Sequence, residues 1–205
     1  MRPSVTILPS ATRSERRNAS ILALHGRGVM ARSFSGHWVR CRELGVTVAL
    51  PQSSQLICHG ICGWDDRQKA IDEIQSAYQF VSQHGHARGS IVLAGYAQGA
   101  DVAIEMATTG GVVSATGLLA IAPEDLLASL SKAVSRRQVV PPLRAFIVAG
   151  RQRLDRRQIA VARRRLDALG IVHKFRFTNG RQEFPADFDT TLIEALQFLV
   201  WSLDE

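Results

Sequence analysis

Short apolar runs recur along the whole chain, and each is bounded by polar, glycine or proline residues. These runs are built mainly from Val, Ile, Leu and Ala, which is typical of strands that are covered on both faces of a sheet. They predict strands over residues 5–8, 20–24, 46–50, 90–94, 118–122, 145–149 and 171–177.

Between these runs, apolar residues recur at the three- and four-residue spacing of an amphipathic helix. In the first such segment Ile71, Ile74, Tyr78 and Val81 share one face, and Asp65 or Asp66 is expected to cap its start. The pattern predicts helices over residues 66–83, 98–108, 155–169 and 188–203, with a further short helix somewhere in 124–142, near the site.

Strands that alternate with helices favour an α/β fold. We therefore expect a mostly parallel central sheet flanked by helices on both faces. The 205 residues suit one domain over 1–205, with 46% apolar and 21% charged residues, as in ordinary globular proteins. No apolar run reaches the length of a membrane span or of a signal peptide, so we expect a cytoplasmic protein without a membrane span.

Three cysteines are too few for a disulfide scaffold. Cys58 and Cys62 flank a short loop that holds His59, but this spacing matches no strong zinc pattern and shows no fourth ligand. We expect no metal and no cofactor.

Basic residues are in excess: the net charge is +7, and arginine outnumbers lysine by 22 to 3. The densest run, 151–165, falls on a predicted helix whose apolar stripe contains Ala162 and Leu166, which leaves Arg157 and Arg164 on the solvated face. There is no aromatic interleaving and no nucleic-acid-binding motif. We therefore expect no nucleic-acid partner.

The segment 91–101 carries the strongest chemical signal. A buried strand runs into Gly95-Tyr96-Ala97-Gln98-Gly99 and then into a helix. A nucleophile elbow has this form, Gly-x-Ser-x-Gly, in which the central residue takes a strained backbone and points into the site. Here that residue is Ala97, whose methyl group cannot attack a carbonyl. A tight strand-to-helix turn with small residues, without any catalytic history, is the alternative interpretation.

A second segment, His25-Gly26-Arg27-Gly28, follows the strand at 20–24. In this position His-Gly-x-Gly is typical of an oxyanion loop. The backbone N–H groups of Arg27 and Gln98 are then expected to converge on one oxygen atom, with Gly26 in the same loop. His25 is expected to orient the loop rather than to act as a base.

Residues 178–188 form a third segment, which follows the last predicted strand, where a catalytic histidine is expected. His173, the only histidine nearby in sequence, lies at the start of that strand and so at the opposite end of the sheet. Ser53, Ser54 and Cys58 lie in a loop expected to border the site, but none has a visible base.

Taken together, these segments resemble the phospholipase/carboxylesterase group of α/β-hydrolases, which includes acyl-protein thioesterases. The resemblance rests on LHGRG at 24–28, PQSSQ at 51–55, WDD at 64–66, GYAQGADVAIEMA at 95–107 and QEFPADF at 182–188. It implies an α/β-hydrolase fold and a serine, aspartate and histidine triad.

The chain departs from that pattern at two of the three triad positions. Ala97 stands at the nucleophile position and Gln182 at the histidine position, while Asp155 is the best match for the acid, although it lies further after the preceding strand than the family's spacing implies. Glutamine cannot take up a proton near neutral pH. Two substitutions indicate natural loss of the triad rather than a single engineered change.

Three hypotheses follow. In the first, the chain is a catalytically impaired pseudo-hydrolase that still binds an ester, acyl or carboxylate ligand. In the second, it is an active carboxylesterase or thioesterase with a non-standard site, or an inactivated form of one. In the third, the fold serves only as a non-catalytic interaction surface. The retained Gly95 and Gly99 favour the first two.

Overall fold

The sheet has seven strands, in the order β1-β3-β2-β6-β7-β8-β9. The structure is a computed structural model that describes residues 4–11, 19–86, 89–109, 113–136, 142–180 and 184–201. All pairs are parallel except that of β1 with β3. The strands are β1 (Val5–Leu8), β2 (Ala19–Leu24), β3 (Val46–Pro51), β6 (Ser90–Tyr96), β7 (Gly117–Ile121), β8 (Arg144–Gly150) and β9 (Val172–Thr178).

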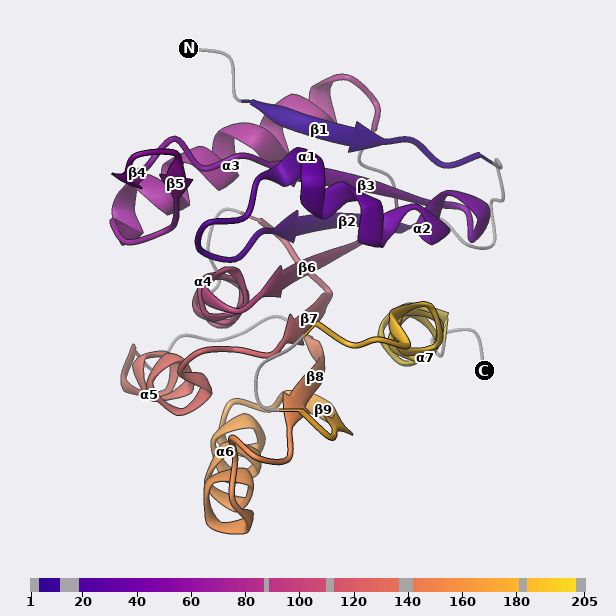
Figure 1. Cartoon of the computed structure of the whole chain (residues 1–205). Helices are drawn as coiled ribbons and strands as arrows, with labels where there is room; N and C mark the ends of the chain where they lie inside the picture. Colours follow the sequence, from indigo (N-terminus) through magenta and orange to yellow (C-terminus); the bar gives the residue numbers. More distant parts are fainter. Residues whose placement is uncertain are drawn as a thin grey trace.

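Helices cover both faces of this sheet (Figure 1). One face carries α3 (Arg67–Gln83), α4 (Gln98–Thr108), α5 (Leu126–Arg136) and α6 (Arg156–Ala168). The other face carries α1 (Ala31–Phe34), the 3-10 turn η2 (Ser35–Trp38), α2 (Arg40–Glu43) and α7 (Phe188–Leu199). The predicted mostly parallel sheet with helices on both faces is confirmed.

Each face of the sheet has its own apolar core. Within β6, Leu93 packs with α3 and α4, whereas its neighbour Val92 packs with α1 and α7, because successive side chains of a strand point to opposite faces. Both are fully buried, so the strand appears in the sequence as a continuous apolar run and not as an alternating one.

The predicted elements agree with the structure to within one or two residues, apart from the end of α7. That helix ends at Leu199 and not at 203, because Val200 leaves the helical conformation with φ −124°. The helix expected within 124–142 is α5. The predicted cap of α3 is Asp66, whose carboxylate accepts from the Lys69 N–H at 3.0 Å.

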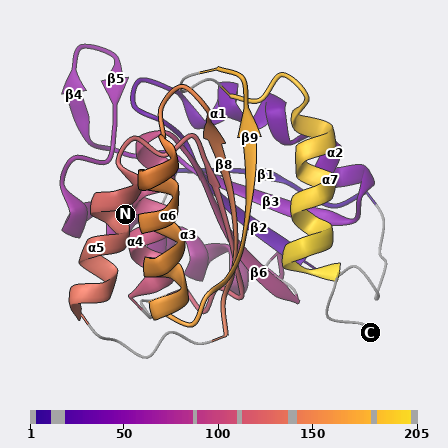
Figure 2. The ribbon, with the colours of Figure 1, turned by 90° about the horizontal axis from the view of Figure 1, so that it is seen from below.

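Residues 56–62 form a small separate hairpin of β4 (Leu56–Cys58) and β5 (Ile61–Cys62), which projects from the carboxyl edge of the main sheet (Figure 2). Cys58 and Cys62 lie on its two strands, and both are free thiols. The hairpin is held to the loop after β2, since the Gly28 N–H donates to the Cys62 carbonyl at 2.8 Å. The loop after β2 and the hairpin therefore meet at this edge of the sheet.

Two findings concern partners. In the part of the chain that the structure describes, no helix combines the length and the apolar character that a membrane crossing needs. On α6, Arg157 and Arg164 are exposed while Ala162 and Leu166 are buried, as the amphipathic pattern predicts.

Candidate active site

Ala97 occupies a strained turn between β6 and α4. Its backbone has φ 50° and ψ −119°, one of two positive φ values among the described non-glycine residues. Such a conformation costs roughly 1–3 kcal/mol and persists only where its surroundings impose it. They do so here: the Ala97 N–H donates to the Ile121 carbonyl at 2.9 Å, and the Ala97 carbonyl accepts from the Ala100 N–H at 2.9 Å. The predicted tight turn with an unusual backbone is confirmed.

The two glycines of the turn allow β6, α4 and β2 to approach one another closely. A Cβ added at Gly95 would lie 2.2 Å from the Gly99 carbonyl oxygen. A Cβ added at Gly99 would lie 2.5 Å from the carbonyl oxygens of both Leu24 and His25. These are backbone atoms that cannot rotate away, so the sequence must have glycine at both positions.

The loop after β2 lies directly against this turn. A Cβ built on Gly26 would lie 3.4 Å from the Ala97 methyl carbon and 3.1 Å from the Tyr96 ring. Among the described residues, the backbone N–H groups of Arg27 and Gln98 donate to no other group of the chain. Gln98 is the first residue of α4, so its N–H also lies at the positive end of the helix dipole. Within the described part of the chain, two backbone donors are therefore left without a partner, one on the turn and one in the loop that packs against it.

His25 is buried, and its ring supports this loop. Its Nε2 faces two donors, the Ser53 N–H at 3.1 Å and the Gln52 side-chain amide at 3.3 Å, so Nε2 is the acceptor. The proton then sits on Nδ1, which donates to the Gly26 carbonyl at 2.8 Å. Burial lowers the pKa of His25, which favours this neutral form. A ring with both nitrogens committed orients the loop, as predicted, and has no position free for proton transfer.

Trp64 ties the same loop to α4. Its indole N–H donates to the His25 carbonyl at 2.8 Å, and its backbone N–H donates to the Gln98 side-chain oxygen at 2.9 Å. The indole is fully buried and lies 4.9 Å from the His25 ring, centroid to centroid. Trp64 is the first residue of the WDD motif. Its buried position and its indole hydrogen bond explain why a tryptophan stands there.

The neighbouring hydroxyl groups serve structural roles. Ser53 is buried; its Oγ donates to the Gly63 carbonyl at 2.6 Å and accepts from the Gln55 N–H at 3.1 Å. Ser54 donates to the Glu73 carboxylate at 2.5 Å. Cys58 is exposed on the hairpin. None of these contacts pairs a nucleophile with a histidine.

Asp155 lies in the loop after β8, where it caps α6. Its Oδ1 accepts from the Gln158 N–H at 2.7 Å, and the Gln158 side chain accepts from the Asp155 N–H at 2.9 Å. This reciprocal pair is a capping box. The second carboxylate oxygen, Oδ2, has no hydrogen-bond partner among the described residues. The role of Asp155 as the triad acid stays a prediction.

Gln182 lies outside the described residues, so its place opposite Ala97 also stays a prediction. Phe184, two residues later, packs against Tyr96 with ring centroids 5.4 Å apart. Tyr96 precedes Ala97, and Phe34 stacks on it at 6.2 Å. Phe184 therefore joins Phe34 and Tyr96 in an aromatic cluster beside the elbow. His173 pairs with Ala145 at the opposite end of the sheet, as predicted.

A hollow of about 390 Å³ lies at the end of β9. Its walls are residues 176–180 and 184–187, and Ala97 takes no part in them. The hollow and the elbow are therefore lined by different residues, although Phe184 borders the hollow and packs on Tyr96 beside the elbow.

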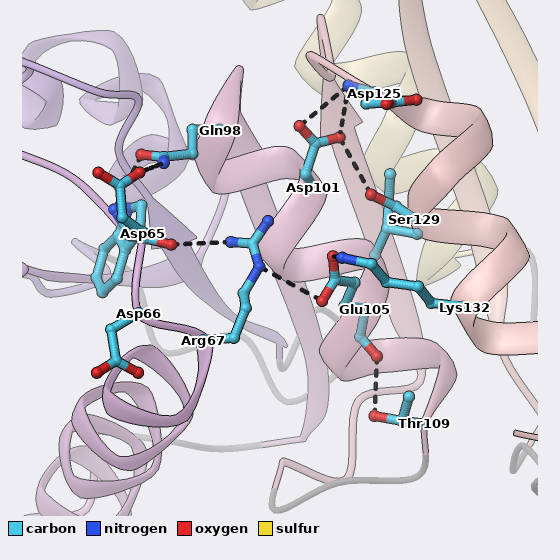
Figure 3. Close-up of polar contacts among 12 residues, drawn as sticks. Asp65, Asp66, Arg67, Gln98, Asp101, Glu105, Thr109, Asp125, Ser129 and Lys132 are labelled. Atoms are coloured by element: carbon cyan, nitrogen blue, oxygen red, sulfur yellow. Dashed lines mark hydrogen bonds and ion pairs between the residues drawn. The ribbon is translucent and has the colours of Figure 1, made fainter.

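Asp101 is a buried carboxylate that the sequence argument missed. It lies on α4, where it accepts from the Glu124 N–H at 3.0 Å and from the Asp125 N–H at 3.1 Å; the contact with Asp125 is drawn in Figure 3. Burial raises its pKa to about 6, and the backbone donors oppose that shift only in part. Ten of the eleven residues of α4 are buried. In the sequence, the signal was an aspartate within a helical segment that is otherwise mostly apolar or small. Asp101 holds the loop between β7 and α5.

Within the described residues, no three histidine, cysteine, aspartate or glutamate side chains gather closely enough to hold a metal ion.

Comparisons with known proteins agree with this geometry. The chain matches no protein-family profile and no curated protein. It is similar to the structure of esterase PE8, with a TM-score of 0.75 and 16% identity over 98% of this chain and 100% of that one. It is also similar to a Bacillus cereus carboxylesterase, with a TM-score of 0.70 and 15% identity over 95% of this chain and 93% of the other.

An uncharacterized protein from Bacillus cereus ATCC 10987 gives a TM-score of 0.73 and 23% identity over 92% of this chain. The present chain spans only 61% of that protein. At these identities the likeness concerns the fold alone, and the mostly parallel seven-stranded sheet with helices on both faces agrees with it. The chain has the α/β-hydrolase fold of these esterases.

Proposed function

We propose that the chain is a catalytically impaired hydrolase of the phospholipase/carboxylesterase type, which binds an ester, acyl or carboxylate ligand without turning it over. The observation that supports this most is the pairing of a methyl group at the strained elbow with two nearby backbone donors that have no partner among the described residues. The donors can hold an oxygen, and the methyl group cannot attack the carbon that carries it.

The expected binding mode follows from these groups. A carbonyl or carboxylate oxygen accepts from the Arg27 and Gln98 N–H groups, and its carbon lies above the Ala97 methyl group. Neutral His25 adds no charge of its own. Glutamine at position 182 supplies no base that could activate a serine or a water molecule.

Hydrolysis of a p-nitrophenyl ester tests this proposal in the parent and three variants: Ala97→Ser, Gln182→His and the double variant. We expect the parent and both single variants to stay near the background rate, because a serine without a base is a weak nucleophile and a base without a serine has only water to activate. The double variant is expected to exceed the sum of the single variants by at least about tenfold, because triad members act as a unit.

Robust turnover by the parent would contradict the proposal and support the alternative, an active carboxylesterase or thioesterase that uses a non-standard site. Replacing Ser53, Ser54 and Cys58 in turn would then locate the nucleophile. An interaction protein without a ligand pocket is the third possibility. It is favoured if the double variant is inactive and the parent binds neither acetate nor a short-chain ester.

A further inference from the structure

One carboxylate contacts both halves of the candidate oxyanion site. Asp65 Oδ1 accepts from the Arg27 guanidinium at 2.5 Å and from the Gln98 side-chain amide at 2.6 Å (the latter contact is drawn in Figure 3). A second bond, from Arg27 to Asp65 Oδ2 at 3.2 Å, makes the ion pair bidentate. The residues that supply the two unused backbone donors therefore share a single side-chain partner.

The Gln98 side chain has one permitted orientation. Its oxygen accepts from the Trp64 N–H and its nitrogen donates to Asp65, so exchanging the two ends would set donor against donor and acceptor against acceptor. The side chain is 5% exposed, and a Cβ at Gly63 would lie 2.8 Å from its oxygen. Asp65 is thus one of two contacts that fix the residue at the start of α4.

The position of the Arg27 side chain depends more on Asp65 than the position of the Gln98 side chain does. Both ends of the pair are nearly half exposed, at 45% and 46%, and Asp65 is the ion-pair partner of Arg27 among the described residues. The peptide that carries the Arg27 N–H is held on its Gly26 side, because the Gly26 carbonyl accepts from His25 Nδ1 at 2.8 Å and from the Val29 N–H at 3.2 Å. Asp65 holds the side chain on the other side of that peptide.

We infer that Asp65 is a positioning residue that aligns the Arg27 and Gln98 backbone donors on one ligand oxygen. The inference rests on the proposed function for the meaning of those donors, although the alignment itself is a property of the ligand-free chain. An exposed ion pair contributes only about 0–1 kcal/mol to stability, so the expected effect of Asp65 is on local order and not on the fold.

The first test measures ¹⁵N order parameters of the backbone in the ligand-free chain. In Asp65→Ala we expect the value for Arg27 to fall from the range of rigid backbone, about 0.85, toward about 0.6. The side-chain amide signals of Gln98 should shift as well. In Asp65→Asn, an acceptor for Gln98 remains but the ion pair is lost, so the Arg27 order should fall while the Gln98 signals stay closer to those of the parent.

Asp72→Ala is the matched control, because it removes the same charge from an exposed position on α3. Asp72 accepts from the Gln68 side chain and contacts neither donor residue. We expect it to leave both sets of signals unchanged. Unchanged order at Arg27 and unchanged Gln98 signals in both Asp65 variants would overturn the inference, whatever the activity measurements give.

The second test uses p-nitrophenyl acetate and the Ala97→Ser, Gln182→His double variant. Adding Asp65→Ala should lower kcat by at least about tenfold with a smaller change in KM, because an oxyanion donor acts mainly in the transition state. Unchanged kcat would overturn the inference. If the double variant is inactive, loss of order in the ligand-free Asp65 variants still supports the alignment, and the failure then belongs to the proposed function.

Discussion

The two sides of the candidate site differ in what their polar groups do. On the side of β2 and β6, the buried side chains of His25, Trp64 and Gln98 hold loops in place and leave two backbone donors beside Ala97. On the side of β8 and β9, the predicted acid, Asp155, caps a helix and the predicted histidine position is Gln182. The comparison teaches that the groups able to hold an oxygen and the residues expected to move a proton are supported separately, by buried packing on one side and by a loop on the other.

A physical reason underlies this separation. The two donors beside the elbow belong to backbone that also closes the junction of β2, β6 and α4, so a change there disturbs the core. The predicted acid, Asp155, lies on an exposed loop, where a side chain can change without unfolding the chain. The predictions below test this difference, from the largest expected effect to the smallest.

The largest loss of stability is expected at Gly99, on the side of β2 and β6. Gly99→Ala should lower the free energy of unfolding by about 3 kcal/mol, because the new methyl group would lie 2.5 Å from two backbone carbonyl oxygens. Urea denaturation measures the change. Gly36→Ala is the control: its Cβ meets nothing within 4 Å, and a change within about 0.5 kcal/mol is expected. Equal effects of the two substitutions would show that the turn has room to relax.

On the same side, the contribution of Asp101 to stability should depend on pH. Its pKa is raised to about 6, so its contribution to stability is present at low pH and is lost as the pH rises through about 6. Asp101→Asn removes this dependence. The parent should therefore lose on the order of 2 kcal/mol relative to the variant between pH 4 and pH 7.5.

Denaturation of the parent and Asp101→Asn across that pH range provides the measurement. The difference between the two proteins isolates Asp101 from His25, whose lowered pKa acts in the opposite direction, since its contribution is lost as the pH falls. A difference that does not vary with pH would mean that Asp101 titrates like an exposed carboxylate.

Asp155 sharpens the comparison on the other side. Asp155→Ala should cost about 1 kcal/mol of stability through loss of the cap, whereas Asp155→Ser should cost little, because serine also caps helices. In the Ala97→Ser, Gln182→His background, however, we expect Asp155→Ser to lower kcat by at least about tenfold, because serine cannot stabilise an imidazolium as a carboxylate does. If kcat is retained in that variant, Asp155 is a cap and nothing more.

Much of this fold could be predicted from the sequence, because strands buried on both faces give continuous apolar runs and long helices give a clear period. The small elements could not. Helices α1 and α2 have four residues each, too few to show a period, and the exposed hairpin of β4 and β5 lacks a buried face that would set an alternation.

The candidate site was predictable where backbone geometry dictates residue type. Gly95, Ala97 and Gly99 could be placed on the turn because few residues tolerate it. The partners of Asp65 and Asp101 could not be foreseen, since each contact joins segments at least 23 residues apart along the chain and depends on where a side chain ends. A motif of short polar residues such as WDD does not reveal which aspartate caps a helix and which joins two loops.

The turn at Ala97 determines what a substitution at position 97 requires of the backbone. Its conformation is imposed by Ile121, by the start of α4 and by two glycines, and none of these contacts uses the side chain at position 97. Whatever small side chain is encoded there is therefore delivered to the same point in space, at the same angle, beside the same donors. A serine encoded at this position would therefore need no rebuilding of the backbone, although it would still lack the base that Gln182 does not supply.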